Sequence, residues 1–165
     1  MAKPVYLMVA CSENRVIGRE GQLPWSIPED TRWYHDHTRG GVCIMGRSSF
    51  DETGVARPDC RTIVLTRQTG KTFPGAEVAR DLDAALALAE QGDAAPIWIC
   101  GGEAVYAEAM DRAERLYLTR VHAEVAGDAR FPDWTHRFTR VIEKRTSADG
   151  DWRYTFQVLE PGSSG

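Results

Sequence analysis

Four short apolar runs constrain the fold of this chain more than any other feature of its sequence. They are VYLMVAC at residues 5–11, VCIM at 42–45, TIVLT at 62–66 and IWIC at 97–100. A strand that is apolar at nearly every position, instead of at every second one, is covered on both faces, as in a parallel sheet. Helix-like segments separate these runs, which favours an α/β protein with a mostly parallel central sheet and helices on both faces.

The end of the sequence follows a different pattern. Segments 138–145 and 152–159 alternate apolar and polar residues, and the turn residues at 147–150 lie between them. This alternation predicts an antiparallel hairpin that closes the sheet. We therefore expect one domain at residues 1–160 and a flexible tail at 161–165. A chain of 165 residues is long enough for one domain to bury about two thirds of its surface in a single core.

Composition and charge narrow the class of protein. The formal net charge is −4, whereas nucleic-acid-binding and membrane-binding proteins normally carry a basic patch, so we expect small-molecule partners only. No apolar run approaches the roughly 20 residues that span a bilayer. Cys11, Cys43, Cys60 and Cys100 lack zinc-ligand spacing, which predicts reduced thiols, no metal and a cytoplasmic protein. No obvious exposed apolar patch stands out, so we expect a monomer.

The segment VIGREGQLPWSIPEDTRWY places one carboxylate among apolar and aromatic residues. Ser26 as N-cap and Pro28 near the first helical position predict a helix. Asp30 follows Ile27 and precedes Tyr34 at helical spacing, so it turns inward with an aromatic ring. It is either an ordinary first-turn acid or a buried carboxylate that needs a partner. Burial raises a carboxyl pKa and the helix N-terminus lowers it, so both directions stay open.

Glycines and polar residues follow the apolar runs. The loop at 12–25 is either an ordinary connection or a lid over a ligand. At 46–50, the sequence GRSSF predicts a helix capped by Ser48 or Ser49, with an arginine beside its N-terminus; this could bind a phosphate, although a cap needs no ligand. The glycine pair at 101–102 would let a pyrophosphate approach the backbone closely. Because G-G-E is not the G-x-G-x-x-G fingerprint, we do not expect a Rossmann fold.

Seven motifs, taken together and in this order, resemble those of the dihydrofolate reductase family. They are V-I-G at 16–18, L-P-W at 23–25, P-E-D at 28–30, M-G-R at 45–47, G-G-x-x-x-Y at 101–106, L-Y-L-T at 116–119 and G-D-x-x-F-P at 127–132. The resemblance implies a three-layer dihydrofolate-reductase-like fold. It also implies NADPH-dependent reduction of 7,8-dihydrofolate to tetrahydrofolate, a step of one-carbon metabolism, by hydride transfer to C6 and protonation at N5.

The resemblance assigns roles to individual residues. Asp30 would hold the N3 and 2-amino edge of the pterin, Thr119 would hydrogen-bond Asp30, and Leu23 and Trp25 would lie beside the reacting atoms. Taken without the family, Thr119 is an ordinary β-branched strand residue. The implied catalytic residues are Asp30, Trp25, Leu23 and Thr119. The implied substrate-binding residues are Met8, Val9, Ala10, Asp30, Thr31, Tyr34, Thr53, Arg57, Cys60 and Thr119, of which Met8 and Ala10 are equally expected as core residues.

The resemblance also implies a cofactor site and an unusual cis peptide bond between Gly101 and Gly102. Arg47 and Arg67, with Arg80 as a weaker third that is equally well explained as a surface arginine, could neutralise a ribose 2′-phosphate. These arginines favour NADPH over NADH. The implied cofactor-binding residues are Ala10, Ile17, Gly18, Gly21, Gln22, Leu23, Gly46, Arg47, Ser48, Ser49, Leu65, Thr66, Arg67, Arg80, Cys100, Gly101, Gly102, Glu103, Ala104, Val105 and Tyr106.

Two positions depart from the family pattern. Cys60 stands where the family usually has an arginine that clamps the glutamate carboxylate of folate, and Arg57 and Arg61 are the candidates to replace it. Thr31 stands where the family usually has a larger apolar residue. We therefore expect an altered benzoyl pocket, with weak binding of the folate tail or an altered response to antifolates, including resistance.

Two other functions remain as alternatives. A pyrimidine reductase of the riboflavin pathway shares the general fold and NADPH, but it should lack the L-P-W and P-E-D motifs of this chain. The chain could also be an inactive module that binds folate or NADPH, and the departure at Cys60 keeps that possibility open. NADPH oxidation with dihydrofolate would distinguish the three.

Overall fold

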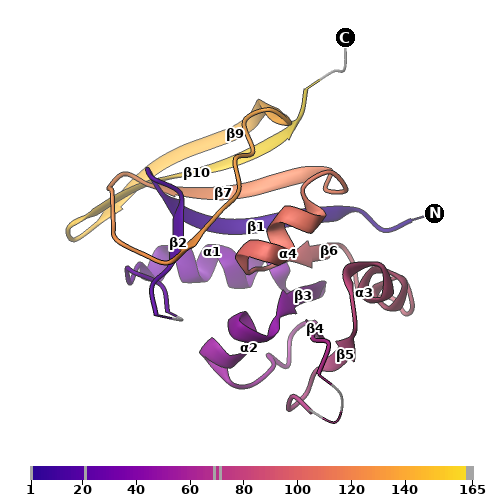
Figure 1. Ribbon diagram of the computed structural model, residues 1–165. Helices are drawn as coiled ribbons and strands as arrows, with labels where there is room; N and C mark the ends of the chain where they lie inside the picture. The colour runs from indigo at the N-terminus through magenta and orange to yellow at the C-terminus, as the bar shows by residue number, and fades with distance from the viewer. Residues whose placement is uncertain (1, 21, 69, 71, 163–165) are drawn as a thin grey trace.

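The protein is described by a computed structural model that covers residues 2–20, 22–68, 70 and 72–162. Within these residues, an eight-stranded sheet runs through the molecule in the order β5-β4-β3-β6-β1-β7-β10-β9 (Figure 1). Its strands are β1 (Val5–Ser12), β3 (Val42–Gly46), β4 (Arg61–Leu65), β5 (Glu77–Ala79), β6 (Ile97–Ile99), β7 (Arg115–Val121), β9 (Phe138–Asp149) and β10 (Trp152–Pro161). The helices are α1 (Pro28–Thr38), α2 (Arg47–Thr53), α3 (Leu82–Ala89) and α4 (Glu103–Ala109).

The four apolar runs form neighbouring parallel strands, as predicted. β3 and β1 flank β6 in matching register, because both Val42 and Val5 pair with Ile97. On β1, Leu7 packs in the cluster that contains residues of α3 and α4, whereas Met8 packs in the cluster that contains residues of α1. Alternate residues of one strand therefore face opposite layers of helices, which explains why nearly every position is apolar.

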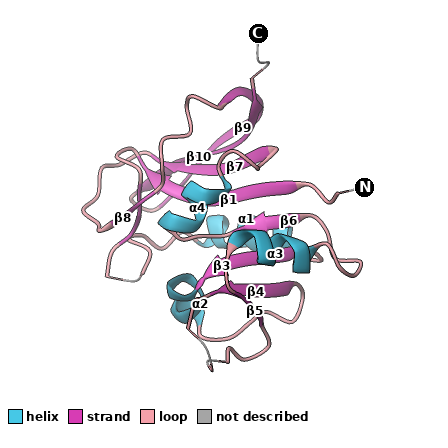
Figure 2. Ribbon diagram, turned by 45° about the vertical axis from the view of Figure 1, so that its right-hand side comes forward, coloured by secondary structure: helices cyan, strands magenta, loops and turns pink. Residues whose placement is uncertain are grey.

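The helices cover both faces of the sheet, which gives the expected three layers (Figure 2). Residues of α3 and α4 share the largest hydrophobic cluster with the strands. On the other face, Trp33 and Tyr34 of α1 pack against Met8 and Tyr117, and Phe50 of α2 packs against Val64. The carboxyl ends of β1, β3 and β6 lie between α1 and α2, so this edge of the sheet is the place where a ligand site is expected.

The C-terminal hairpin is antiparallel, as predicted, but its strands are longer and its turn is later. Asp149 pairs with Trp152, so the turn lies at residues 150–151 and the segment 147–149 belongs to β9. Gly150 has φ +60°, a conformation that a two-residue hairpin turn requires. β10 is buried between β7 and β9, whereas β9 is an exposed edge strand.

Two local predictions, both of helix caps, were wrong. Ser26 does not cap α1: the N-cap is Ile27, whose side chain is buried and which makes no capping hydrogen bond, so core packing instead of a cap sets the start of the helix. Ser48 and Ser49 do not cap α2 either, because α2 begins directly after β3 with Gly46 as its N-cap. In both helices, the side chain of the N-cap residue therefore accepts no hydrogen bond from a first-turn N–H group.

The loop at 12–25 is less irregular than predicted. It contains β2 (Val16–Gly18), which pairs with β8 (Ala129–Arg130) in a separate two-stranded sheet. The Val16 backbone N–H donates to Ser12 Oγ at 2.9 Å, and Asn14 Nδ2 donates to the Val125 carbonyl oxygen at 2.9 Å. The first half of the loop is thus fixed to the body of the protein. Among the described residues, no helix is long and apolar enough to cross a membrane.

Candidate active site

A cleft of about 540 Å³ lies between α1, α2 and the carboxyl ends of the central strands. Fifteen of the residues expected at a substrate or cofactor site line it: Met8, Val9, Ala10, Ile17, Leu23, Asp30, Thr31, Tyr34, Ser49, Arg57, Cys60, Cys100, Gly101, Gly102 and Tyr106. They come from segments far apart in the sequence, so the fold brings together what the motifs only suggested.

Asp30 is the carboxylate at the inner end of the cleft. Thr119 of β7 is buried, and its Oγ1 donates a hydrogen bond to Asp30 Oδ1 at 2.7 Å. The register of the sheet sets this contact, because Thr119 pairs with Ala10, which lines the cleft. Burial raises the pKa of Asp30 to about 6; the Thr119 hydrogen bond opposes the shift, and the charge of Glu29 adds to it. The expected contact between these two residues is therefore present, and burial decides the direction of the shift.

Glu29 precedes Asp30 on α1 but has a different environment. Its carboxylate accepts hydrogen bonds from Ser147 Oγ at 2.6 Å and Tyr154 Oη at 2.7 Å, and it pairs with Arg145 Nη1 at 2.9 Å. These contacts lower its pKa to about 2. Glu29 anchors α1 to the C-terminal hairpin, whereas Asp30 faces the cleft.

Two turns meet beside the cleft where a dinucleotide was expected. The peptide bond between Gly101 and Gly102 is cis, as the family resemblance implied, and Gly101 has φ +114°. A Cβ atom at Gly101 would lie 2.9 Å from Ser49 Oγ, and the positive φ disfavours residues with a side chain, so the position favours glycine. The Gly46 N–H donates to the Gly101 carbonyl oxygen at 2.8 Å, which joins the start of α2 to the start of α4.

The remaining expected cofactor residues lie beyond the cleft wall. Arg47, Arg67 and Arg80 follow the carboxyl ends of the adjacent strands β3, β4 and β5. Arg47 pairs with Asp51 at 3.6 Å and donates to Gln68 Oε1 at 2.8 Å. The others outside the cleft lining are Gly18, Gln22, Gly46, Ser48, Leu65, Thr66, Glu103, Ala104 and Val105.

Three expected site residues need separate comment. Trp25 does not line the cleft: it is buried in the cluster that contains Ile27 and Val121, because its indole completes the core beneath the loop. Gly21 lies outside the described residues. Thr53 ends α2, and its side chain is outside the described part of the structure.

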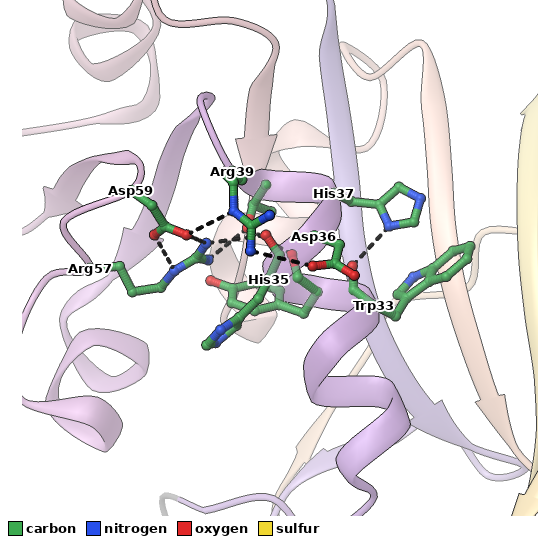
Figure 3. Close-up of polar contacts among 9 residues, drawn as sticks. Trp33, His35, Asp36, His37, Arg39, Arg57 and Asp59 are labelled. Carbon is green, nitrogen blue, oxygen red and sulfur yellow. Dashed lines mark hydrogen bonds and ion pairs between the residues drawn. The ribbon is translucent and has the colours of Figure 1, made fainter.

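Arg57 and Arg61, the two candidates to replace the missing arginine at Cys60, have different environments in the structure. Arg61 turns away from the cleft, pairs with Glu77 and donates to the carbonyl oxygen of Leu88 at 3.0 Å. Arg57 lines the cleft, and Figure 3 shows its guanidinium beside Asp59. Of the two arginines, only Arg57 is placed to meet a ligand.

Sequence reasoning missed several residues of the cleft wall: His35, Cys43, Met45, Phe50, Glu52, Val55, Ala56, Pro58 and Thr62. Strand alternation contained the signal for Cys43 and Met45, which share the face of Met8. Glu52 is a second cleft carboxylate; burial raises its pKa and a hydrogen bond from the Leu23 backbone opposes the rise. The loop residues 55–58 follow no periodic pattern that could have indicated them.

A parallel α/β sheet with a cleft at its strand ends, a carboxylate of raised pKa and a close glycine turn is typical of enzymes that bind a nucleotide or another small molecule. The family model for dihydrofolate reductase matches residues 4–161. The chain belongs to the dihydrofolate reductase family.

Curated relatives agree with this assignment, and a solved structure has the same fold. A dihydrofolate reductase of Neisseria meningitidis serogroup B is 40% identical over 156 residues, 92% of this chain and 94% of that protein. The type 3 dihydrofolate reductase of Salmonella typhimurium is 38% identical over 147 residues, 89% of this chain and 90% of that protein. A solved dihydrofolate reductase from Enterococcus faecalis, complexed with NADP(H) and RAB-propyl, has the same fold, with a TM-score of 0.88, 24% identity and 97% of both chains covered.

Proposed function

We propose that this protein catalyses the NADPH-dependent reduction of 7,8-dihydrofolate to 5,6,7,8-tetrahydrofolate. The observation that carries the proposal is Asp30, a carboxylate of raised pKa that lines the cleft and is held by Thr119. A carboxylate in this position accepts hydrogen bonds from both the N3 and the 2-amino group of a pterin, which form a planar pair of donors.

Asp30 acts on the pterin through charge. With a pKa of about 6, it is mainly ionised at neutral pH and can still take up a proton during the reaction. Its negative charge favours a protonated pterin, and the proton reaches N5 through water. The cleft wall formed by Met8, Tyr34 and Phe50 holds the flat ring and limits access of solvent.

The cofactor chemistry is carried by NADPH, which supplies the hydride for C6. The glycine turn suits a dinucleotide, because Gly101 and Gly102 line the cleft and carry no side chain that would hold a phosphate away from the backbone. The first-turn N–H groups of α2 and α4 have no side-chain caps and would bind the pyrophosphate. Arg47, Arg67 and Arg80 would surround the 2′-phosphate.

The loop that contains Leu23 is proposed to cover the reacting atoms. Leu23 lines the cleft although the residue is 46% exposed, which suits a residue that becomes buried when ligands bind. Trp25, packed beneath it, would support the loop from the core. We further propose a monomer that works in the cytoplasm; the four free cysteines suit a reducing compartment.

The direct test is the oxidation of NADPH by the purified protein with 7,8-dihydrofolate, followed together with the formation of tetrahydrofolate. We expect stoichiometric conversion of both. No oxidation, despite measured binding of NADPH, would contradict the proposed reaction. Oxidation only with a pyrimidine of the riboflavin pathway would instead identify the alternative reductase.

A further inference from the structure

The outer end of the cleft is the part beside the last turns of α1, where His35, Arg57 and Cys60 line the wall. Its one arginine among the described residues, Arg57, already forms hydrogen bonds within the protein. Arg57 donates through Nε and Nη2 to the two carboxylate oxygens of Asp59, each at 3.0 Å. Its Nη1 donates to Thr38 Oγ1 at 2.6 Å, and Nη2 also donates to the His35 carbonyl oxygen at 3.2 Å. Four of the five guanidinium N–H groups therefore have acceptors inside the protein (Figure 3).

The charge of Arg57 is balanced as well as its hydrogen bonds. The hydrogen bonds and charge of Arg57 lower the pKa of Asp59 to about 2, so Asp59 is ionised at every physiological pH. Asp59 also accepts from Arg39 Nε at 3.4 Å, and Arg39 in turn pairs with Asp36. The Arg57 side chain is only 19% exposed, which limits its freedom to leave this cluster.

No other lining residue offers a comparable cation in the described cleft. The lining includes neither lysine nor a second arginine, and burial together with the charge of Arg57 lowers the pKa of His35. A ligand carboxylate that reaches this end must therefore interact with Arg57. To form a bidentate pair through Nε and Nη2, it has to displace Asp59, and the exchange of one carboxylate for another yields little net free energy. To pair through Nη1 and Nη2 instead, it has to displace Thr38 or the His35 carbonyl oxygen and lie beside the Asp59 carboxylate, which repels it.

The Nε and Nη2 donors of Arg57, which both bind Asp59, form the Arg57 fork. We propose that Asp59 is a specificity-determining residue: an internal carboxylate that occupies this fork and suppresses recognition of a substrate carboxylate. This inference rests on the proposed function, because 7,8-dihydrofolate carries a glutamate whose two carboxylates extend away from the pterin. The wild-type protein then discriminates weakly between charged and uncharged tails.

The opposite role for Asp59 is a positioning one, in which it aims Arg57 at the substrate. The two roles predict opposite effects of Asp59→Asn. A competing carboxylate, once neutralised, frees the fork and strengthens binding of a charged tail. A positioning carboxylate, once neutralised, releases Arg57 and weakens binding of the same tail.

The experiment compares 7,8-dihydrofolate with its glutamate diamide, which keeps every ring but lacks both charges. For the wild type we expect KM values within about twofold of each other, because the fork is occupied. In Asp59→Asn, KM for dihydrofolate should fall roughly 5- to 10-fold, KM for the diamide should not change, and kcat should be unaffected. Added salt should reduce the new preference.

Matched variants isolate the cause. Asp36→Asn removes the same charge from the same cluster but leaves the Arg57 fork occupied, so it should not create a preference. Arg57→Gln combined with Asp59→Asn should abolish the preference again. Asp59→Ser, a smaller replacement, should reproduce the effect if Asp59→Asn does not fold.

Three results would overturn the inference. They are a wild-type preference of about tenfold or more for the charged tail, a rise in KM for dihydrofolate in Asp59→Asn, and no change in this KM in either Asp59→Asn or Asp59→Ser. Failure of the proposed reaction would look different, since no variant would turn over either compound. Dissociation constants measured by tryptophan fluorescence would then compare the charged and uncharged tails without catalysis.

Discussion

The two ends of the cleft differ in how well their charged side chains are paired. At the inner end, Thr119 is the hydrogen-bond donor to Asp30 among the described residues, and burial raises the pKa of Asp30 to about 6. At the outer end, Arg57 and Asp59 neutralise each other through two hydrogen bonds, and Thr38 and His35 accept two more from Arg57. The poorly solvated group, Asp30, is the one proposed to take part in the chemistry, whereas Arg57, with four of its five N–H groups engaged, is available to a ligand carboxylate mainly by exchange.

The same contrast occurs between neighbouring residues of α1. Glu29 and Asp30 are adjacent, yet their pKa values are about 2 and about 6. Successive residues of a helix point in directions about 100° apart, so one carboxylate reaches the donors of the hairpin and the other reaches the cleft. Environment, and not residue type, separates a structural acid from a functional one.

Neutralising Asp30 should have the largest effect. Asp30→Asn removes the charge that holds the pterin, so kcat should fall roughly 100-fold or more at neutral pH, while the dissociation constant for NADPH changes less than about twofold. Steady-state kinetics and a cofactor titration measure the two quantities. The matched control is Glu29→Gln, which should retain most of the turnover; equal activity of Asp30→Asn and wild type would remove Asp30 from this role.

The same pair of variants should change stability in opposite directions. The pKa of Asp30 is higher in the folded protein, at about 6, than its ordinary value of 3.8, so its contribution is full below about pH 3.8 and is lost as pH rises through 6. At pH 7, Asp30→Asn should therefore increase the free energy of unfolding, by up to about 3 kcal/mol.

Glu29 has the reverse dependence. Its pKa is lowered from 4.5 to about 2, so its contribution is present above about pH 4.5 and is lost as pH falls towards 2. Glu29→Gln should lower the free energy of unfolding at pH 7 by roughly 1–2 kcal/mol, a value reduced for its partial exposure. Urea titrations at pH 4 and pH 7 measure the free energy of unfolding of both variants. Changes of the same sign at pH 7 would contradict the contrast between Glu29 and Asp30.

Removing the hydrogen bond that Thr119 donates to Asp30 tests how that contact sets the pKa of Asp30. Thr119→Val keeps the shape of the side chain but removes the hydrogen bond that opposes the rise in pKa. The apparent pKa in the pH profile of kcat/KM should therefore move above about 6, with a turnover at pH 7 that is lower by a few-fold. Thr155→Val, a buried threonine outside the cleft lining, should leave the profile unchanged.

Most of the fold and the inner end of the site could be predicted from the sequence. The apolar runs determine which strands are buried, and the spacing within α1 directs Asp30 inward, so both follow from local pattern. The start of α1 was predicted one residue early, because burial of Ile27 outweighs the capping preference of Ser26. Such packing is decided by residues distant in sequence.

The outer end of the cleft could not be predicted in the same way. The bidentate pair of Arg57 and Asp59 depends on Thr38 and His35 of α1, which are about 20 residues away and complete the coordination of the guanidinium. Nothing in the local sequence RPDCR distinguishes an arginine that faces a ligand from one that is already paired. The sequence therefore indicated Arg57 as a candidate but not its occupied state.

The thiols at the outer end should give the smallest effect. Cys43 Sγ and Cys60 Sγ lie 3.8 Å apart in the cleft wall, and their contact and burial raise the pKa of the Cys60 thiol. The thiolate is the nucleophile, so iodoacetamide should modify Cys60 at pH 7.5 several-fold more slowly than an unfolded control in urea. Mass spectrometry of digested protein measures the rate. Alkylation of Cys60 as fast as in the unfolded chain would mean that this end of the cleft is open and solvated, and the occupied Arg57 fork would then be a transient pair instead of a lasting barrier to a charged ligand.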